Sequence, residues 1–261
     1  MEIYMYHHRL VISYKGSNYF GWQDLGEKDE KATVQATINE VLKQICKQQK
    51  CNISTASRTD AGVHAQGQVV KITIPLVIAS EKLLLGMNSL LPEDIRILKC
   101  ESCPATFNPN RDSKSKEYHY YFCTDPISNP VYHDIVAHIT SRRGTLDIEG
   151  MQEACKCFIG EHDFYSFAKR DATMHMTLRT IISCEILEAK SSIFGSKIYY
   201  LKIVGTGFLR HMVRYIAGAL FEIGKKQLSV NDVTEALVMH KEKKVSAKAK
   251  AKGLHLIEVF Y

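Results

Sequence analysis

The chain has none of the features that place a protein in or across a membrane. No apolar run reaches the roughly 18 residues of a membrane span. The first residues, Met1–Tyr4, lack the basic stretch followed by an apolar stretch that begins a signal peptide. Low-complexity segments and strong internal repeats are also missing, and with 45% hydrophobic residues disorder is not expected. These absences predict a folded, cytoplasmic protein without a membrane partner.

The cysteines and histidines form no recognisable metal site or disulfide framework. Eight cysteines are scattered over 261 residues, which fits reduced intracellular thiols. Cys100 and Cys103 have the spacing of half a zinc site, but Cys155 and Cys157 are one residue too close to supply the other half. None of the eleven histidines belongs to an H-E-x-x-H pattern. We therefore expect no metal.

The net charge of +6 permits a polyanionic partner without demonstrating one. The length suits one large domain or two smaller ones. Residues 108–115 are polar and rich in turn formers, so the sequence predicts a crossover there between two halves, 1–107 and 108–261.

Apolar periodicity predicts both strands and helices. The expected strands are 9–14, 68–74, 95–100, 116–122, 179–187, 198–204 and 254–260. A turn at 191–196 is expected between strands 179–187 and 198–204. The expected helices start at Thr33 and Ser80 as N-caps, and cover 148–158, 208–223 and 230–239 further on. Short connections favour antiparallel pairing, so the fold class is α+β, with helices on one face of a largely antiparallel sheet in each half.

The polar loop Ala56–Ala65 is the strongest candidate for chemistry. If it is extended, Arg58 and Asp60 point to the same side and form an ion pair. A neighbouring cation lowers the pKa of an aspartate, so Asp60 would stay charged near neutral pH and be able to act as nucleophile or base. Gly62 suits a turn that needs a positive φ. The alternative is a surface ion pair beside a hairpin.

Two further segments carry candidate binding residues. A helix over 208–223 puts Arg210 and Arg214 four residues apart on one face, where an anion would relieve their repulsion; the alternative is two solvated arginines. Tyr118 and Tyr120 lie on one face of a strand and offer rings for base stacking, or else are half-buried sheet residues.

Taken in order, these segments resemble the TruA family of tRNA pseudouridine synthases. Residues 57–64 resemble its R-T-D-A-G-V-H motif. The other matching segments follow in the family's order over nearly the whole chain: Tyr14–Gly16, Gly21–Gln23, Lys116-x-Tyr118-x-Tyr120, Gly160–Phe167, Arg179–Ile181, Gly207–Arg214, and Gly253–Leu256 with Tyr261.

The resemblance implies that a uridine in tRNA is isomerised to pseudouridine, in the anticodon stem-loop, without metal or organic cofactor. Asp60 matches the family's catalytic aspartate, and an isomerase that excludes water can work with one carboxylate where glycoside hydrolysis needs two. Whether Asp60 attacks the sugar, attacks the base or removes a sugar proton is left open. The resemblance also implies a homodimer and an active-site cleft between the two halves.

The same matching assigns residues to binding. Tyr118 would stack on the uracil or assist proton transfer at C5, and Arg58 and Arg214 would hold Asp60 and the flipped nucleotide. The remaining expected contacts are Thr59 and His64 to the substrate and Trp22, Gln23, Lys116, Arg210 and His211 to the RNA.

Four departures from the family pattern affect the RNA contacts more than the catalysis. Ser57 replaces a glycine, Lys15 an acidic residue, Asp24 a basic residue, and Lys248–Lys252 an alanine-proline approach. The alternatives to the predicted function are a synthase acting at another RNA site, and an RNA-binding or tRNA-folding protein whose catalysis is dispensable.

Overall fold

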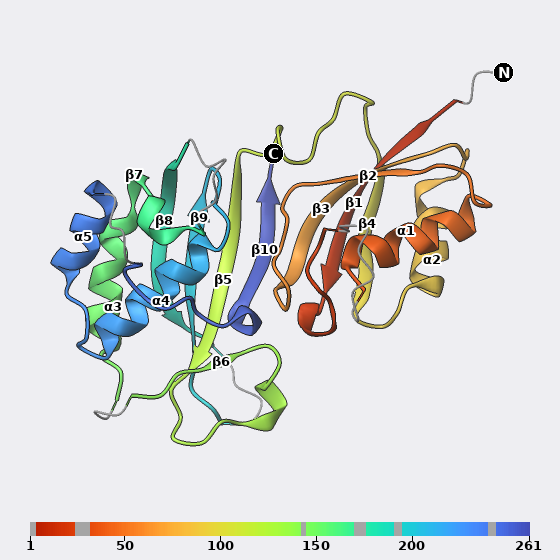
Figure 1. Ribbon diagram of the computed structural model, residues 1–261. Coiled ribbons are helices and arrows are strands. Elements are labelled where there is room, and N and C mark those ends of the chain that lie inside the picture. Colours follow the sequence, from red (N-terminus) through yellow and green to blue (C-terminus); the bar gives the residue numbers. More distant parts are fainter. Residues whose placement is uncertain (1–3, 24–31, 142–144, 170–175, 191–194, 240–243) are drawn as a thin grey trace. The chain divides into compact units, whose positions relative to one another are not determined.

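A computed structural model describes residues 4–23, 32–141, 145–169, 176–190, 195–239 and 244–261. Asp24 and residues 191–194 of the expected turn lie outside this set. The chain forms two compact units (Figure 1): unit 1 comprises residues Met1–Lys114 and Leu256–Tyr261, and unit 2 comprises Ser115–His255. The chain therefore passes from one unit to the other twice.

Unit 1 is an antiparallel sheet with two helices. Its elements are β1 (Tyr6–Tyr14), α1 (Val34–Ile45), β2 (Asn52–Thr55), β3 (His64–Ile74), α2 (Ser80–Leu90), β4 (Ile95–Ser102) and β10 (Leu254–Phe260), whose first two residues are counted with unit 2. The strand order is β4-β1-β3-β10, and β2 also pairs with β3. Helices α1 and α2 contact each other, and α2 contacts β4 (Figure 1).

Alternation of side chains gives the sheet of unit 1 its buried face. Along β1, Leu10 and Ile12 are fully buried while their neighbours Arg9, Val11 and Ser13 are half-buried, as period-two patterning requires. The antiparallel register sets Leu10 opposite Val70 and Ile12 opposite Gln68. A glutamine therefore occupies a core position of an otherwise apolar strand face.

Unit 2 is a second sheet with three helices. Its strands are β5 (Ser115–Cys123), β6 (Ala137–His138), β7 (Gly160–Asp163), β8 (Leu178–Glu188) and β9 (Ile198–Gly205), and its helices are α3 (Ile148–Cys155), α4 (Met212–Gly224) and α5 (Val230–Val238). The order is β5-β9-β8-β7 with antiparallel pairing, and the short β6 pairs with β5 in parallel. Contacts join α3 to β8, α4 to β5 and α5 to β7. The α+β class expected from the sequence is confirmed.

Two helix starts differ from the sequence prediction. The N-cap of α2 is Ala79, and Ser80 is already the first helical residue. Helix α4 begins at Met212 rather than at 208, because His211 at its N-cap is left-handed, with φ of 66°. By contrast, Thr33 caps α1 as expected, with its hydroxyl oxygen accepting a hydrogen bond from the Ala36 N–H at 3.2 Å.

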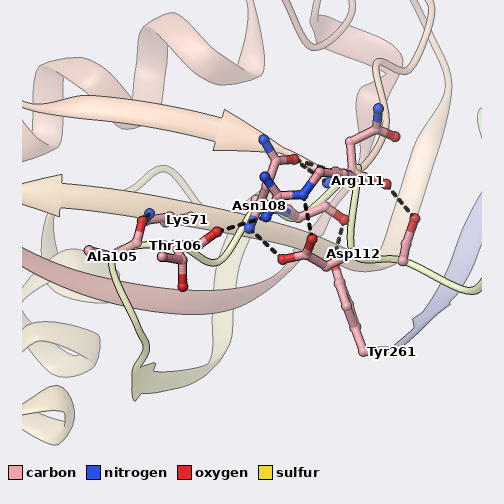
Figure 2. Close-up of polar contacts among 10 residues, drawn as sticks. Lys71, Ala105, Thr106, Asn108, Arg111, Asp112 and Tyr261 are labelled. Atoms are coloured by element: carbon pink, nitrogen blue, oxygen red, sulfur yellow. Dashed lines mark hydrogen bonds and ion pairs between the residues drawn. The ribbon is translucent and has the colours of Figure 1, made fainter.

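The crossover loop belongs to unit 1, which moves the boundary from the expected residue 107 to Lys114. Figure 2 shows the polar contacts that hold it. Arg111 donates to Asp112 Oδ1 at 2.8 Å and to the Thr106 carbonyl at 2.9 Å, and the Asn108 N–H donates to Asp112 Oδ2 at 2.8 Å. The Tyr261 hydroxyl donates to the Pro109 carbonyl at 2.7 Å. These bonds tie the loop to the end of β10.

Within the ranges given above, no helix combines the length and the hydrophobicity needed to cross a membrane.

Candidate active site

The loop 56–63 joins two paired strands of unit 1, β2 and β3, and we call it the aspartate loop. Asp60 opens a tight turn in it, where the Val63 N–H donates to the Asp60 carbonyl at 3.1 Å. Gly62 has φ of 77°, the positive value expected from its place in the sequence. The turn sets the backbone of Asp60 in one conformation.

Residues 16–22 brace the aspartate loop through their main chain. The N–H of Trp22 donates to the Thr59 carbonyl at 3.0 Å, and the Gly62 N–H donates to the Tyr19 carbonyl at 3.3 Å. Gly21 has φ of 94°, and a Cβ there would lie 2.8 Å from the Thr59 carbonyl oxygen. A Cβ at Gly16 would collide with the Val63 carbonyl. Glycine at these two positions therefore lets the segment approach the backbone on both sides of Asp60.

Thr59 and His64 point into unit 1. The Thr59 hydroxyl lies 2.7 Å from the Tyr14 hydroxyl, and His64 Nδ1 accepts the Gly16 N–H at 3.1 Å. Both side chains are buried. In this arrangement both side chains hold the loop, and their expected contact with substrate stays a prediction.

Trp22 is only 1% exposed, with its ring 6.1 Å from that of Tyr14. The expected RNA contact of Trp22 stays a prediction. The neighbouring Gln23 is half-buried. Trp22 is a core residue of unit 1 whose main chain supports the aspartate loop.

The structure describes both Arg58 and Asp60, and their expected ion pair stays a prediction. The Arg58 side chain is exposed, whereas Asp60 is half-buried. Residues 57–60 belong to the loop between β2 and β3, so no strand pairing fixes the direction of the Arg58 side chain. Arg58 is therefore left at the surface of the loop.

In unit 2, β5 turns Lys116, Tyr118 and Tyr120 to its buried side. The Tyr118 ring meets Phe208 edge to face, with centroids 5.0 Å apart. Lys116 is 7% exposed, and burial lowers the pKa of its ammonium group to about 8. The expected contact of Lys116 with RNA stays a prediction.

Arg214 and Arg210 do not share a helical face. Arg210 precedes α4 and is exposed, while Arg214 lies in its first turn and is 8% exposed. Arg214 Nε donates to the Ala249 carbonyl at 2.8 Å, and the Ala249 N–H donates to the Arg214 carbonyl at 3.1 Å. This reciprocal pair orients the guanidinium group. His211 Nδ1 lies 3.4 Å from Lys248 Nζ.

Comparison with known proteins identifies the family. A sequence model described as tRNA pseudouridine synthase matches residues 10–109 and 154–261. The chain belongs to the tRNA pseudouridine synthase family. It is 46% identical to tRNA pseudouridine synthase A 2 of Desulfotalea psychrophila over 98% of both chains. It is 35% identical to tRNA pseudouridine synthase A 2 of Clostridium tetani, over 97% of this chain and 98% of that one. The corresponding protein of Protochlamydia amoebophila is 36% identical, with coverage of 97% and 93%.

The chain thus belongs to a family of isomerases. Asp60 lies in unit 1, whereas Tyr118 and Arg214 lie in unit 2. That Asp60, Tyr118 and Arg214 meet at one site stays a prediction. In the part of the chain with described structure, no three His, Cys, Asp or Glu side chains gather where they would hold a metal ion.

Sequence reasoning missed two residues that support this family's motifs here. Ala249 contacts Arg214 only through its main chain, so its residue type in the sequence gives no sign of this role. Gln68 left a visible signal, because it is a polar residue on the core face of a strand that is otherwise apolar.

Proposed function

We propose that this protein isomerises uridine to pseudouridine in tRNA, in the anticodon stem-loop, with Asp60 as the catalytic nucleophile. The observation that carries the proposal is the aspartate loop itself: the family motif is present without a gap, and its backbone is fixed on both sides of Asp60. A preorganised carboxylate needs little rearrangement to reach a reacting atom, and this preorganisation lowers the barrier of the catalysed reaction.

The reaction conserves atoms, which suits a site with one carboxylate. The bond from N1 of uracil to C1′ of the ribose breaks and a bond from C5 to C1′ forms, while the C5 proton is lost and N1 gains one. Tyr118, on β5, is proposed to stack on the uracil or assist the proton transfer at C5. Arg214, oriented by Ala249, is proposed to hold the flipped nucleotide.

The net positive charge gives this substrate a general attraction. Lysines and arginines that neutralise phosphates bind RNA with an affinity that falls as salt rises, and they read shape more than sequence. Arg58 and Arg210 are exposed and available for such contacts. The expected homodimer is open to direct measurement by light scattering of the purified protein.

The test is Asp60→Asn, with Glu40→Gln as a matched control that removes an exposed carboxylate on α1 of the same unit. Asp60→Asn should abolish pseudouridine formation on purified tRNA while salt-dependent tRNA binding persists; Glu40→Gln should retain both. Residual turnover in a pure Asp60→Ala sample would refute the catalytic assignment.

The choice of target is tested separately, by mapping pseudouridines in tRNA from cells with and without this chain. Loss confined to the anticodon arm is expected. Unchanged sites there, with loss elsewhere, would favour a synthase for another RNA position. Binding without any isomerisation by the wild-type protein would favour the RNA-folding alternative.

A further inference from the structure

Gln68 occupies a position where an apolar side chain would be expected. It lies on the core face of β3, opposite Ile12 of β1, and none of it is exposed. Burying a primary amide is costly unless its donors and acceptor are paired. The structure shows where those hydrogen bonds go.

The side-chain hydrogen bonds of Gln68 lead to the aspartate loop and to its support. Nε2 donates to the Ser57 carbonyl at 2.7 Å, and Oε1 accepts the Ser57 N–H at 3.2 Å. Nε2 also lies 3.4 Å from the Tyr14 hydroxyl, which in turn lies 2.7 Å from the Thr59 hydroxyl. The glutamine thus fixes residue 57 directly and residue 59 through Tyr14.

The side-chain amide takes the place of a neighbouring strand. The ladder between β2 and β3 continues to the bond from the Ala56 N–H to the Val69 carbonyl at 2.9 Å, and the chain then leaves the sheet. At the next residue, Ser57, both main-chain groups are paired by Gln68 instead. The loop therefore departs from the sheet along a defined path, three residues before Asp60.

We propose that Gln68, acting with the Tyr14 hydroxyl, is a positioning residue for the isomerisation: it holds the approach to Asp60 so that the carboxylate meets the nucleotide in its reactive geometry. The inference rests on the proposed role of Asp60. Catalytic groups must be held to within about half an ångström, and a displacement of about 1 Å can cost a hundredfold in rate. Gln68 has no need to touch the substrate to have this effect.

The first experiment compares Gln68→Leu with Val70→Ala. Val70 lies two residues along the same strand, on the same face, and is also fully buried, so its truncation weakens the core of unit 1 without touching the aspartate loop. At a temperature where both variants are folded, Gln68→Leu should lower kcat at least tenfold, with KM and tRNA affinity changed less than threefold. Val70→Ala should lower the melting temperature with little effect on kcat.

The second experiment uses Gln68→Glu and its pH profile. An ionised carboxylate at this position would face the Ser57 carbonyl oxygen without a proton to donate, whereas the protonated acid restores both bonds to Ser57. Burial and that carbonyl both favour the neutral acid and raise its pKa. The activity of Gln68→Glu relative to wild type should therefore rise severalfold as pH falls from 8 to 6, while the ratio for Val70→Ala stays flat.

Three results would overturn the inference: a kcat for Gln68→Leu within twofold of Val70→Ala, a loss confined to KM, or a Gln68→Glu ratio that does not change with pH. Should Gln68→Leu fail to fold, the second experiment is sufficient, because it follows how the activity of Gln68→Glu relative to wild type changes between pH 8 and pH 6. A wild-type protein inactive on tRNA would instead refute the proposed function, so the two failures are distinguishable.

Discussion

Replacing Gly21 by alanine should damage catalysis more than stability, because the glycine touches the backbone of the aspartate loop. Gly21 has φ of 94°, outside the range that a residue with a Cβ adopts readily, and such strain costs about 1 to 3 kcal/mol. For a chain of this size that corresponds to a fall in melting temperature of about 2 to 10 °C.

The added Cβ would also collide with the loop. It would lie 2.8 Å from the Thr59 carbonyl oxygen, 3.0 Å from the Ala61 nitrogen and 3.1 Å from the Asp60 carbonyl carbon. Relief to ordinary contact requires these main-chain atoms to retreat by about half an ångström, which displaces Asp60 itself. We expect a loss of about tenfold or more in kcat.

The assay is single-turnover pseudouridine formation with saturating enzyme, paired with a thermal unfolding curve. Gly86→Ala is the control: it lies inside α2, and a Cβ there meets nothing within 4 Å. Alanine in a helix interior should raise stability by about 0.5 to 1 kcal/mol and leave the rate unchanged. Wild-type rate and melting temperature in Gly21→Ala would refute the reasoning.

Two further predictions concern charge in unit 2. Burial lowers the pKa of Lys116 to about 8 in the folded protein, whereas a lysine in the unfolded chain has a pKa near 10.4. Between these two pH values the unfolded chain binds more protons than the folded protein, so the free energy of unfolding should rise with pH. Urea unfolding at pH 7 and pH 10 measures this rise, and Lys116→Met should lack the part that comes from Lys116. A rise of the same size in wild type and in Lys116→Met would contradict the prediction. Lys248 is exposed beside His211, so Lys248→Ala should lower the slope of log affinity for tRNA against log salt by about 1. Lys156→Ala, which removes an exposed lysine paired with Glu153, should leave the slope unchanged.

Local signals in the sequence were sufficient where structure is decided locally. Thr33 followed by apolar residues at helical spacing identified α1, and the strand expected at 254–260 has the observed bounds of β10. The start of α4 was missed because Phe208 and Leu209 extend the apolar spacing of the helix toward its N-terminus. The left-handed backbone of His211, which makes the helix begin at Met212, cannot be read from that spacing. Periodicity reports which face is apolar, and backbone conformation at the ends depends on contacts made elsewhere.

The same division holds for the candidate site. The motif located the aspartate loop, but it did not show that the side chains of Thr59 and His64 are buried. The sequence cannot distinguish an exposed Trp22 from a buried one, nor reveal that Thr59 is paired with Tyr14, 45 positions away. The supporting contacts are long-range, so only the fold shows them.

The return of residues 256–261 to unit 1 has a consequence for how the protein is made. Strand β3, which follows the aspartate loop, acquires its neighbour β10 only after the whole of unit 2 has been synthesised. During translation the edge of β3 in the unit that contains Asp60 therefore stays unpaired, and unpaired strand edges promote aggregation of nascent chains. A nonsense or frameshift mutation near residue 255 would therefore damage the unit that contains the aspartate loop, although almost two hundred residues separate the two in the sequence.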